Sequence, residues 1–194
     1  MISEEKINSN YLCWTQKLEK YGCYSESMIE EIGMAIKDAS YGMNVESGAA
    51  YQGALLDVTL KYLCNYGYRL NESFQKTNLY VSMEQLMKVL LLQHISKCEM
   101  FMYQTNAYSV KNGRLYTFTE LPTKLKMGER SVYLCTKYGI KLSEEEYEAM
   151  ISVDKSDESG DIFMSPLALL VKTVNKLVNA ELRQKYIKSQ NDCQ

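Results

Sequence analysis

Apolar residues recur at intervals of three and four through most of the chain, a spacing that places them on one face of a helix. This pattern predicts a first helix that carries Ile7 and Leu18 and ends at Gly22, because glycine commonly ends helices. Ser25, a typical N-terminal cap, opens a second helix. The segment from Ala39 to Tyr51 is rich in Gly, Ser and Asn and predicts an irregular loop.

The same periodicity predicts five more helices, over roughly residues 54–66, 82–92, 127–138, 143–151 and 167–186. Gly67 is expected to end the first of these. Ser82 and Gln85 form a capping-box pattern for the next helix, as Ser143 and Glu146 do further along. The nearly continuous apolar run from 87 to 92 indicates burial on most sides, so this helix is predicted to be central.

One segment predicts strands instead of helix. Asn112 and Gly113 lie between the stretches Tyr108–Val110 and Leu115–Phe118, and Asn-Gly is a strong signal for a two-residue hairpin turn. The fold class that follows is all-α with one small β-hairpin at the surface. A chain of 194 residues, of which 46% are hydrophobic, is expected to form a single domain over 1–194.

Charge and cysteine usage narrow the environment. A net charge of −2 gives no general attraction to duplex nucleic acid or to an anionic membrane. The N-terminal segment lacks the pattern of a signal peptide, and no apolar run is long enough to span a bilayer, so a cytoplasmic location is expected. The six cysteines are scattered singly, which favours free thiols over disulfides or a zinc site.

Several segments, taken in order, resemble the HD-domain phosphohydrolase superfamily. Residues 89–97 are similar to the family's core helix, in which an apolar run leads to an adjacent His-Asp pair followed by a lysine. Residues 53–60, 127–134, 144–154 and 167–175 are similar to the flanking helices that carry further metal ligands. The resemblance covers residues 39 to about 180 and implies an HD-like core over 39–186, on which the N-terminal helices of 3–38 pack.

The metal ligands of that family are replaced here. The resemblance assigns the ligand positions to Val58, Gln93, His94, Met127, Asp154, Lys172 and Asn175. His94 is the only histidine of the chain, and a centre built from several imidazoles and carboxylates cannot be assembled from one imidazole. We therefore expect no metal, no cofactor and no catalytic residue, which makes the protein a pseudoenzyme of the HD fold.

Cationic residues near these positions suggest a use for the vacated site. Lys97, Arg130 and Lys172, with Lys124 and Lys126, would hold an anion without a metal if they line the pocket. The alternative is that they are ordinary surface residues. His94 is either part of a site or a hydrogen-bonded histidine of the core. We also predict an ion pair between Lys172 and Asp154, since a buried carboxylate without a cation is unfavourable.

Three functions remain open at this point. The first is binding of a nucleotide or another phosphorylated small molecule in the remodelled pocket, by Val58, Gln93, His94, Lys97, Met127, Arg130, Asp154, Lys172 and Asn175. The second is a structural or regulatory module that binds a protein partner or a second copy of the chain. The third is a residual or repurposed phosphohydrolase that uses His94 and Asp154 as an acid-base pair.

Overall fold

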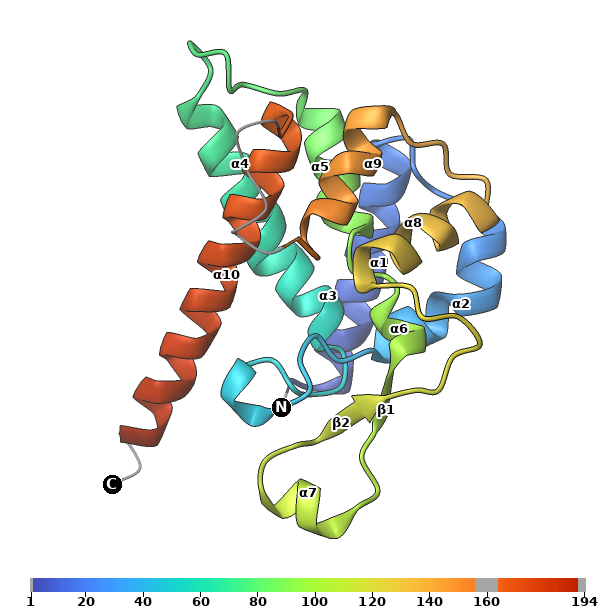
Figure 1. Ribbon diagram of the computed structural model, residues 1–194, viewed down its shortest axis with the longest axis vertical. Coiled ribbons are helices and arrows are strands. Elements are labelled where there is room, and N and C mark those ends of the chain that lie inside the picture. Colours follow the sequence, from blue (N-terminus) through green and yellow to red (C-terminus); the bar gives the residue numbers. More distant parts are fainter. Residues whose placement is uncertain (1, 156–163, 192–194) are drawn as a thin grey trace.

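The computed structural model describes residues 2–155 and 164–191. This part of the chain is all-α with a small antiparallel two-stranded sheet, as predicted (Figure 1). Its elements are α1 (Glu4–Lys20), α2 (Glu26–Asp38), η1 (Val45–Ser47), α3 (Ala54–Val58), η2 (Thr59–Leu63), α4 (Cys64–Ser73), α5 (Met83–Leu92), α6 (Lys97–Met100), β1 (Phe101–Tyr103), α7 (Ala107–Lys111), β2 (Tyr116–Phe118), α8 (Met127–Lys137), α9 (Glu144–Ser152) and α10 (Pro166–Asn191).

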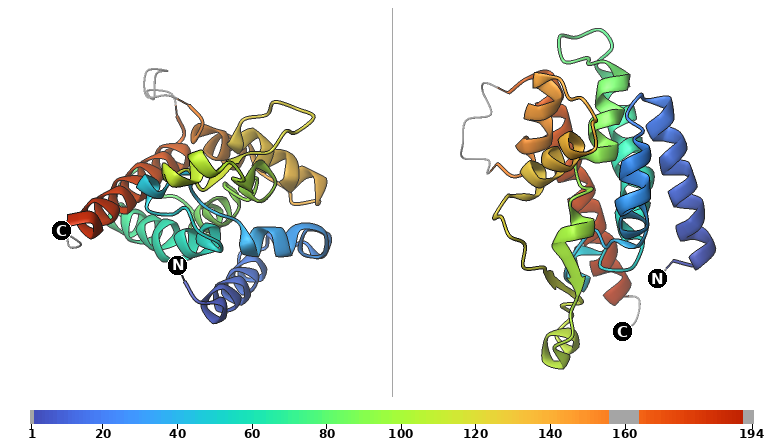
Figure 2. Two further views of the ribbon diagram at one scale, coloured as in Figure 1. Left: turned by 90° about the horizontal axis from the view of Figure 1, so that it is seen from below. Right: turned by 90° about the vertical axis from the view of Figure 1, so that its right-hand side faces the viewer.

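Helix α5 is central, as its apolar run predicts. Residues 89–92 are all buried, and the helix packs against α1, α4, α9 and α10. Figure 2 shows α1 and α2 on one side of the bundle and α8, α9 and α10 on the other. The N-terminal helices contact the rest mainly through α3, and α10 runs along α4 and α9. The core therefore lies around α5, between these two groups of helices.

Most predicted helix ends are confirmed. Gly22 has a φ of 63°, a left-handed conformation that glycine adopts without steric cost, directly after α1. The side chain of Ser25 caps α2, and Ser143 with Glu146 forms a reciprocal capping box at α9. Ser165 accepts a hydrogen bond from the N–H of Ala168 at the start of α10. These local signals are reliable because neighbouring residues alone satisfy the helix ends.

The capping box at Ser82 is wrong, although α5 begins where it was predicted. The Ser82 side chain makes no capping hydrogen bond to the backbone of α5 within the described residues. Instead, the fully buried Asn71 bonds both backbone groups of Val81, as acceptor and as donor, each at 3.0 Å. A contact from α4 therefore determines how the chain enters α5, and a local pattern cannot reveal it.

Gly67 does not end a helix. The helical path runs from Ala54 through Ser73, with one π-helical turn at η2, and Gly67 lies inside α4. A side chain at this position would collide with Leu90 of α5, so the glycine allows α4 and α5 to approach closely. The reason for the wrong prediction is that glycine serves close packing here and not helix termination.

The hairpin exists, but its first strand lies earlier than predicted. Strand β1 pairs with β2 in the register Phe101↔Phe118 and Tyr103↔Tyr116, whereas the predicted strand 108–110 belongs to helix α7. The side chain of Asn106 caps this helix, and Gly113, with a φ of 78°, follows its end. Asn-Gly is suited both to hairpin turns and to helix ends, and here it ends a helix.

Two expectations from composition can be compared with the structure. Among the described residues, no helix has both the length and the apolar character needed to cross a membrane. The described cysteines are free thiols, as predicted: Cys13, Cys23, Cys64, Cys98 and Cys135. Cys193 lies outside the described residues.

Candidate functional site

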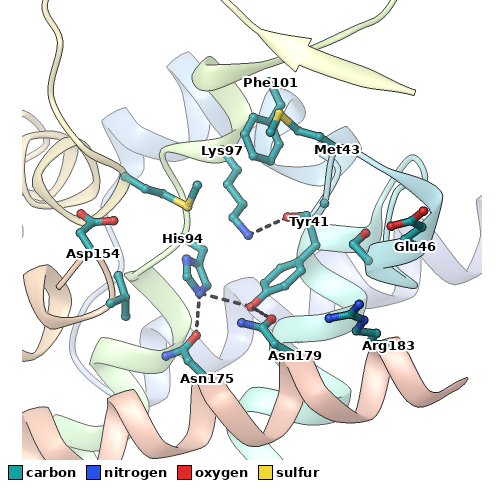
Figure 3. A pocket seen from close by; sticks show the side chains of 14 residues that line it. Tyr41, Met43, Glu46, His94, Lys97, Phe101, Asp154, Asn175, Asn179 and Arg183 are labelled. Carbon is teal, nitrogen blue, oxygen red and sulfur yellow. Dashed lines mark hydrogen bonds between the residues drawn. The ribbon is translucent and has the colours of Figure 1, made fainter. Parts of the chain in front are cut away.

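A cavity of about 490 Å³ opens where the loop after α2, the α5–α6 segment and α10 meet. Figure 3 shows its side chains at close range. Five predicted site residues line it: His94, Lys97, Met127, Asp154 and Asn175. The residues that the sequence did not single out are Tyr41, Gly42, Met43, Glu46, Ser47, Phe101, Val153, Asn179 and Arg183.

Tight turns between α5 and α6 bring His94 and Lys97 to the cavity. The regular helix ends at Leu92, and the following N–H groups bond back over three residues, for example Lys97 to the carbonyl of His94 at 3.1 Å. Ser96 anchors this segment to α8, because its N–H donates to Ser131 Oγ at 3.2 Å and its hydroxyl to the Met127 carbonyl at 2.9 Å. The segment is therefore held in place by buried hydrogen bonds.

His94, Asn175 and Gln93 form a buried polar network. The amide nitrogen of Asn175 donates to the Val171 carbonyl at 2.8 Å and to Gln93 Oε1 at 2.9 Å. The Asn175 oxygen must therefore face His94 Nε2, at 2.8 Å, and this nitrogen carries the proton. In this tautomer Nδ1 is an acceptor, and it has no partner among the described residues, nor does Gln93 Nε2.

His94 is neutral in the folded protein. Burial lowers its pKa well below 6.5, and the nearby Lys97 charge lowers it further, while the hydrogen bond to Asn175 acts in the opposite direction. The hydroxyl of Tyr41 also approaches Nε2, at 3.4 Å. The network therefore presents amide, imidazole and phenol groups, none of which is charged, to the floor of the cavity.

Lys97 is the basic side chain at the floor of the cavity. Its side chain is buried, and Nζ donates to the backbone carbonyl of Tyr41 at 2.6 Å and lies 3.3 Å from the centre of the Tyr41 ring. Within the described part of the chain, no carboxylate lies within ion-pair distance of this amine. Burial lowers the pKa of Lys97 to about 7, so both protonation states are populated near neutral pH.

Charged side chains lie at two sides of the cavity. Figure 3 shows Glu46 and Arg183 on the Tyr41 side and Asp154 beyond His94. Glu46 and Arg183 are exposed, at the mouth of the cavity. The carboxylate of Asp154 accepts a hydrogen bond from the N–H of Gly128 at 2.6 Å, and partial burial raises its pKa. Asp154 therefore caps α8, which begins at Met127.

Four predicted site residues lie outside the cavity lining, and three of them are Val58, Gln93 and Arg130. Val58 is fully buried in the core, and Gln93 lies behind Asn175, to which it is bonded. Arg130 pairs with Glu99, at 2.7 Å between Nη2 and Oε2, and also donates to Thr123. Its guanidinium group is therefore engaged outside the cavity, and Lys124 and Lys126 are exposed.

The predicted ion pair between Lys172 and Asp154 is wrong. Both residues are described, and no ion pair joins them. Lys172 is buried on α10, outside the cavity lining, whereas Asp154 bonds to the first turn of α8. The backbone N–H groups at the N-terminus of α8 stabilise the Asp154 carboxylate, so it does not require a lysine partner.

The missed residues differ in how far the sequence could have revealed them. The missed residues Asn179 and Arg183 continue from the predicted Asn175 at a spacing of four on α10, which places all three on one face of that helix. This line of polar residues along one face of α10 is a sequence signal that could have indicated Asn179 and Arg183. Tyr41 and Glu46 lie in an irregular loop, where no periodicity exists, so only the folded structure brings them to the cavity.

The donor set does not suit a divalent metal. At the positions that the resemblance assigns to ligands, His94 is bonded to Asn175 and Asp154 to Gly128. Among the described residues, no three His, Cys, Asp or Glu side chains gather in a way that could hold a metal ion. Comparisons of the chain with family models, with curated proteins and with solved structures found no match.

Proposed function

We propose that the protein binds a nucleotide or another phosphorylated small molecule in this cavity and does not hydrolyse it. The observation that carries the proposal is Lys97, a buried amine that faces an open cavity without a carboxylate partner among the described residues. A protonated lysine in this position is unfavourable unless an anion joins it. A ligand phosphate would supply that anion.

Other features of the cavity fit the same class of ligand. Arg183 at the mouth offers a second cation, and guanidinium groups bind phosphate oxygens in a bidentate manner. Tyr41 and Phe101 add aromatic surface to the lining. A volume of about 490 Å³ lies in the usual range for small-molecule sites. These features support a ligand with a phosphate group and an uncharged ring or chain.

We further propose that the scaffold is HD-like and has lost the catalytic activity of that family. The support is the position of His94 and Lys97 at the end of the central helix, and the replacement of a ligand aspartate by an amide at Asn175. Hydrolysis by His94 and Asp154 as an acid-base pair has less support, because each is bonded to another group. In this proposal the protein holds its ligand unchanged.

A thermal-shift panel of mono-, di- and cyclic nucleotides and simple sugar phosphates tests the proposal at pH 7. A ligand present at ten times its Kd stabilises the native state by about 1.4 kcal/mol, which raises the melting temperature by about 3 to 6 °C for a chain of this size. Lys97→Gln should abolish the shift. The matched control is Arg130→Gln, which should retain it, since Arg130 pairs with Glu99 outside the cavity.

The pH dependence provides an independent check. Because the pKa of Lys97 is about 7, the affinity for a phosphorylated ligand should fall by up to about tenfold per pH unit above pH 7 as the amine loses its charge. Isothermal titration calorimetry should show proton uptake on binding near pH 7. A panel without any shift, or a shift that persists in Lys97→Gln, would contradict the proposal.

A second candidate function is association with another protein, for which the hairpin is the specific observation. Met102, Tyr103, Tyr108 and Phe118 are exposed on β1, α7 and β2, a segment that projects from the helical bundle (Figure 1). Exposed apolar clusters commonly mark interaction surfaces. Sedimentation velocity over a concentration series, with Tyr103→Ser/Phe118→Ser as the variant, tests self-association. A monomer at all concentrations would exclude the second copy as the partner.

A further inference from the structure

The uncharged form of Lys97 has no role in anion binding, yet its position suits a different chemistry. Nζ faces the cavity and uses one donor, toward the Tyr41 carbonyl. The titratable groups around it are His94 and Tyr41, and the cavity is further lined by Glu46, Asp154 and Arg183. Within the described residues none of these carboxylates pairs with the amine, so no ion pair stabilises its protonated form.

We infer that Lys97 is a reactive amine that condenses with a small aldehyde or ketone in the cavity to form an imine. The inference does not depend on phosphate binding, because it uses the neutral amine and a carbonyl carbon. A ligand that combined a carbonyl group with a phosphate would satisfy both. The ligand class is therefore a small carbonyl compound, with or without an anionic group.

The chemistry requires no partner other than the carbonyl compound. The lone pair of Nζ attacks the carbonyl carbon, a C–N bond forms, and the C=O π electrons move to oxygen, which takes up the proton that nitrogen loses. The resulting carbinolamine then loses its hydroxyl group and a second nitrogen proton as water, which leaves the C=N bond. No oxidant or reductant is needed. If the imine nitrogen then takes up a proton from solvent, its single N–H can donate to the Tyr41 carbonyl.

Burial supplies the nucleophilic form at neutral pH. An amine with a pKa of about 7 is half unprotonated at pH 7. An ordinary lysine has a pKa of about 10.4, so its neutral fraction at this pH is smaller by a factor on the order of 1000. Lowering the pKa by desolvation in an apolar pocket is a recognised way to activate a lysine for Schiff-base formation. The aromatic rings of Tyr41 and Phe101 form part of that environment.

Reductive trapping tests the inference on the intact protein. Butanal, an uncharged aldehyde, is added at pH 7 with sodium cyanoborohydride, which reduces the imine to a stable secondary amine, and peptides are mapped by mass spectrometry. Lys97 should be modified at least about tenfold faster than the exposed Lys111, given its larger neutral fraction. Raising the pH to 9 should narrow the difference, because ordinary lysines then begin to react.

Two variants extend the test. Lys97→Arg keeps a cation but cannot form an imine, so the fast adduct should disappear while circular dichroism shows the same helix content. Lys111→Arg, on the exposed surface of α7, should leave the Lys97 adduct unchanged. Labelling of Lys97 that is no faster than that of Lys111 overturns the inference without involving any variant. Because butanal carries no charge, this result is separate from success or failure of the nucleotide panel.

Discussion

Lys88 lies on α5 and Lys97 on α6, the next helix of the chain. The amine of each points into the protein, but the two amines have different partners. Nζ of Lys88 pairs with Glu146 at 2.8 Å and donates to the Lys141 carbonyl at 2.6 Å. The amine of Lys97 has one backbone carbonyl and an aromatic ring. Lys97 is also the more buried, because it is a buried residue whereas Lys88 is partly exposed.

The contrast separates a lysine that joins two helices through an ion pair from one that we propose to be a ligand-binding residue. Lys88 joins α5 to α9, and each charged group satisfies the other, so no ligand is needed. Lys97 lies beside a cavity, and no carboxylate of residues 2–155 and 164–191 forms an ion pair with its amine. A described carboxylate partner separates the predicted cations more sharply than their number does: Arg130, which the sequence also indicated, has Glu99 as its partner.

Glu146→Gln should be the most damaging change, because it removes the carboxylate that makes Lys88 a structural residue. The amide keeps an oxygen for the Ser143 N–H but leaves Lys88 without its counter-charge. We expect a loss of about 3 kcal/mol in the free energy of unfolding, measured by urea denaturation. The double variant Lys88→Met/Glu146→Gln should recover part of this loss, and a loss below about 1 kcal/mol in the single variant would contradict the comparison.

Lys97→Met should act in the opposite direction and stabilise the protein by about 2 kcal/mol at pH 7. The folded-state pKa of Lys97, about 7, lies below the usual value of about 10.4 for an unfolded chain. Between these values the unfolded state binds more protons, so the stability of the unchanged protein rises with pH, and the burial penalty is full below pH 7. Urea denaturation at pH 7 and pH 10 should show the advantage of the variant disappearing at the higher pH.

Lys111→Met is the control for that experiment, since this lysine is exposed and its removal should change the free energy of unfolding little at either pH. A Lys97→Met variant that is less stable than the unchanged protein at pH 7 would mean that its hydrogen bond to Tyr41 outweighs the charge penalty.

Asn175→Asp would introduce a carboxylate into the cavity, next to His94, as Glu146 places one next to Lys88. The new oxygen would replace one that lies 2.8 Å from His94 Nε2, and an opposite charge at this distance should raise the pKa of His94 by roughly one unit or more, or about 1.4 kcal/mol per unit. Because His94 is the only histidine, ¹⁵N NMR of its ring reports this directly. An unchanged titration of His94 would argue against the geometry of the network.

The weakest coupling is expected between Lys172 and Asp154, which form no ion pair. In a double-mutant cycle with alanine at both positions, their contributions to the free energy of unfolding should add to within about 0.5 kcal/mol. Asp154→Ala alone should be destabilising, because the N–H of Gly128 loses its acceptor. A coupling above about 1 kcal/mol would mean that the two charges interact after all.

The sequence predicted the fold well where local rules decide it. Gly22, Ser25 and the Ser143–Glu146 pair fulfil their predicted roles because a helix end is satisfied by its own neighbours. The predictions failed at Gly67 and at the first hairpin strand. At Gly67 a contact with Leu90, distant in the chain, decides the structure, and before Gly113 two local interpretations of Asn-Gly were equally compatible with the sequence.

The candidate site was predicted only in part, because contacts between residues distant in the chain cannot be derived from local sequence. The ordered resemblance to a known family singled out His94, Lys97 and Asn175, and the structure brings these three residues to one cavity. Arg130 has the right charge, but sequence does not reveal that Glu99 neutralises it. Tyr41 supplies both the carbonyl and the ring against Lys97 from an irregular loop, and such contacts depend on the whole fold.

The π-helical turn at η2 determines where this helix can change its length. A π-turn holds one residue more than the α-helical turn it replaces, so the flanking helices α3 and α4 keep their faces while the extra residue is absorbed between them. Deleting one residue from 59–63 should therefore leave a regular helix whose two ends still face the same neighbours. The same deletion within α4 would rotate the remainder of that helix by about 100° and turn Asn71 away from Val81. Natural length variation in this helix should thus be confined to η2.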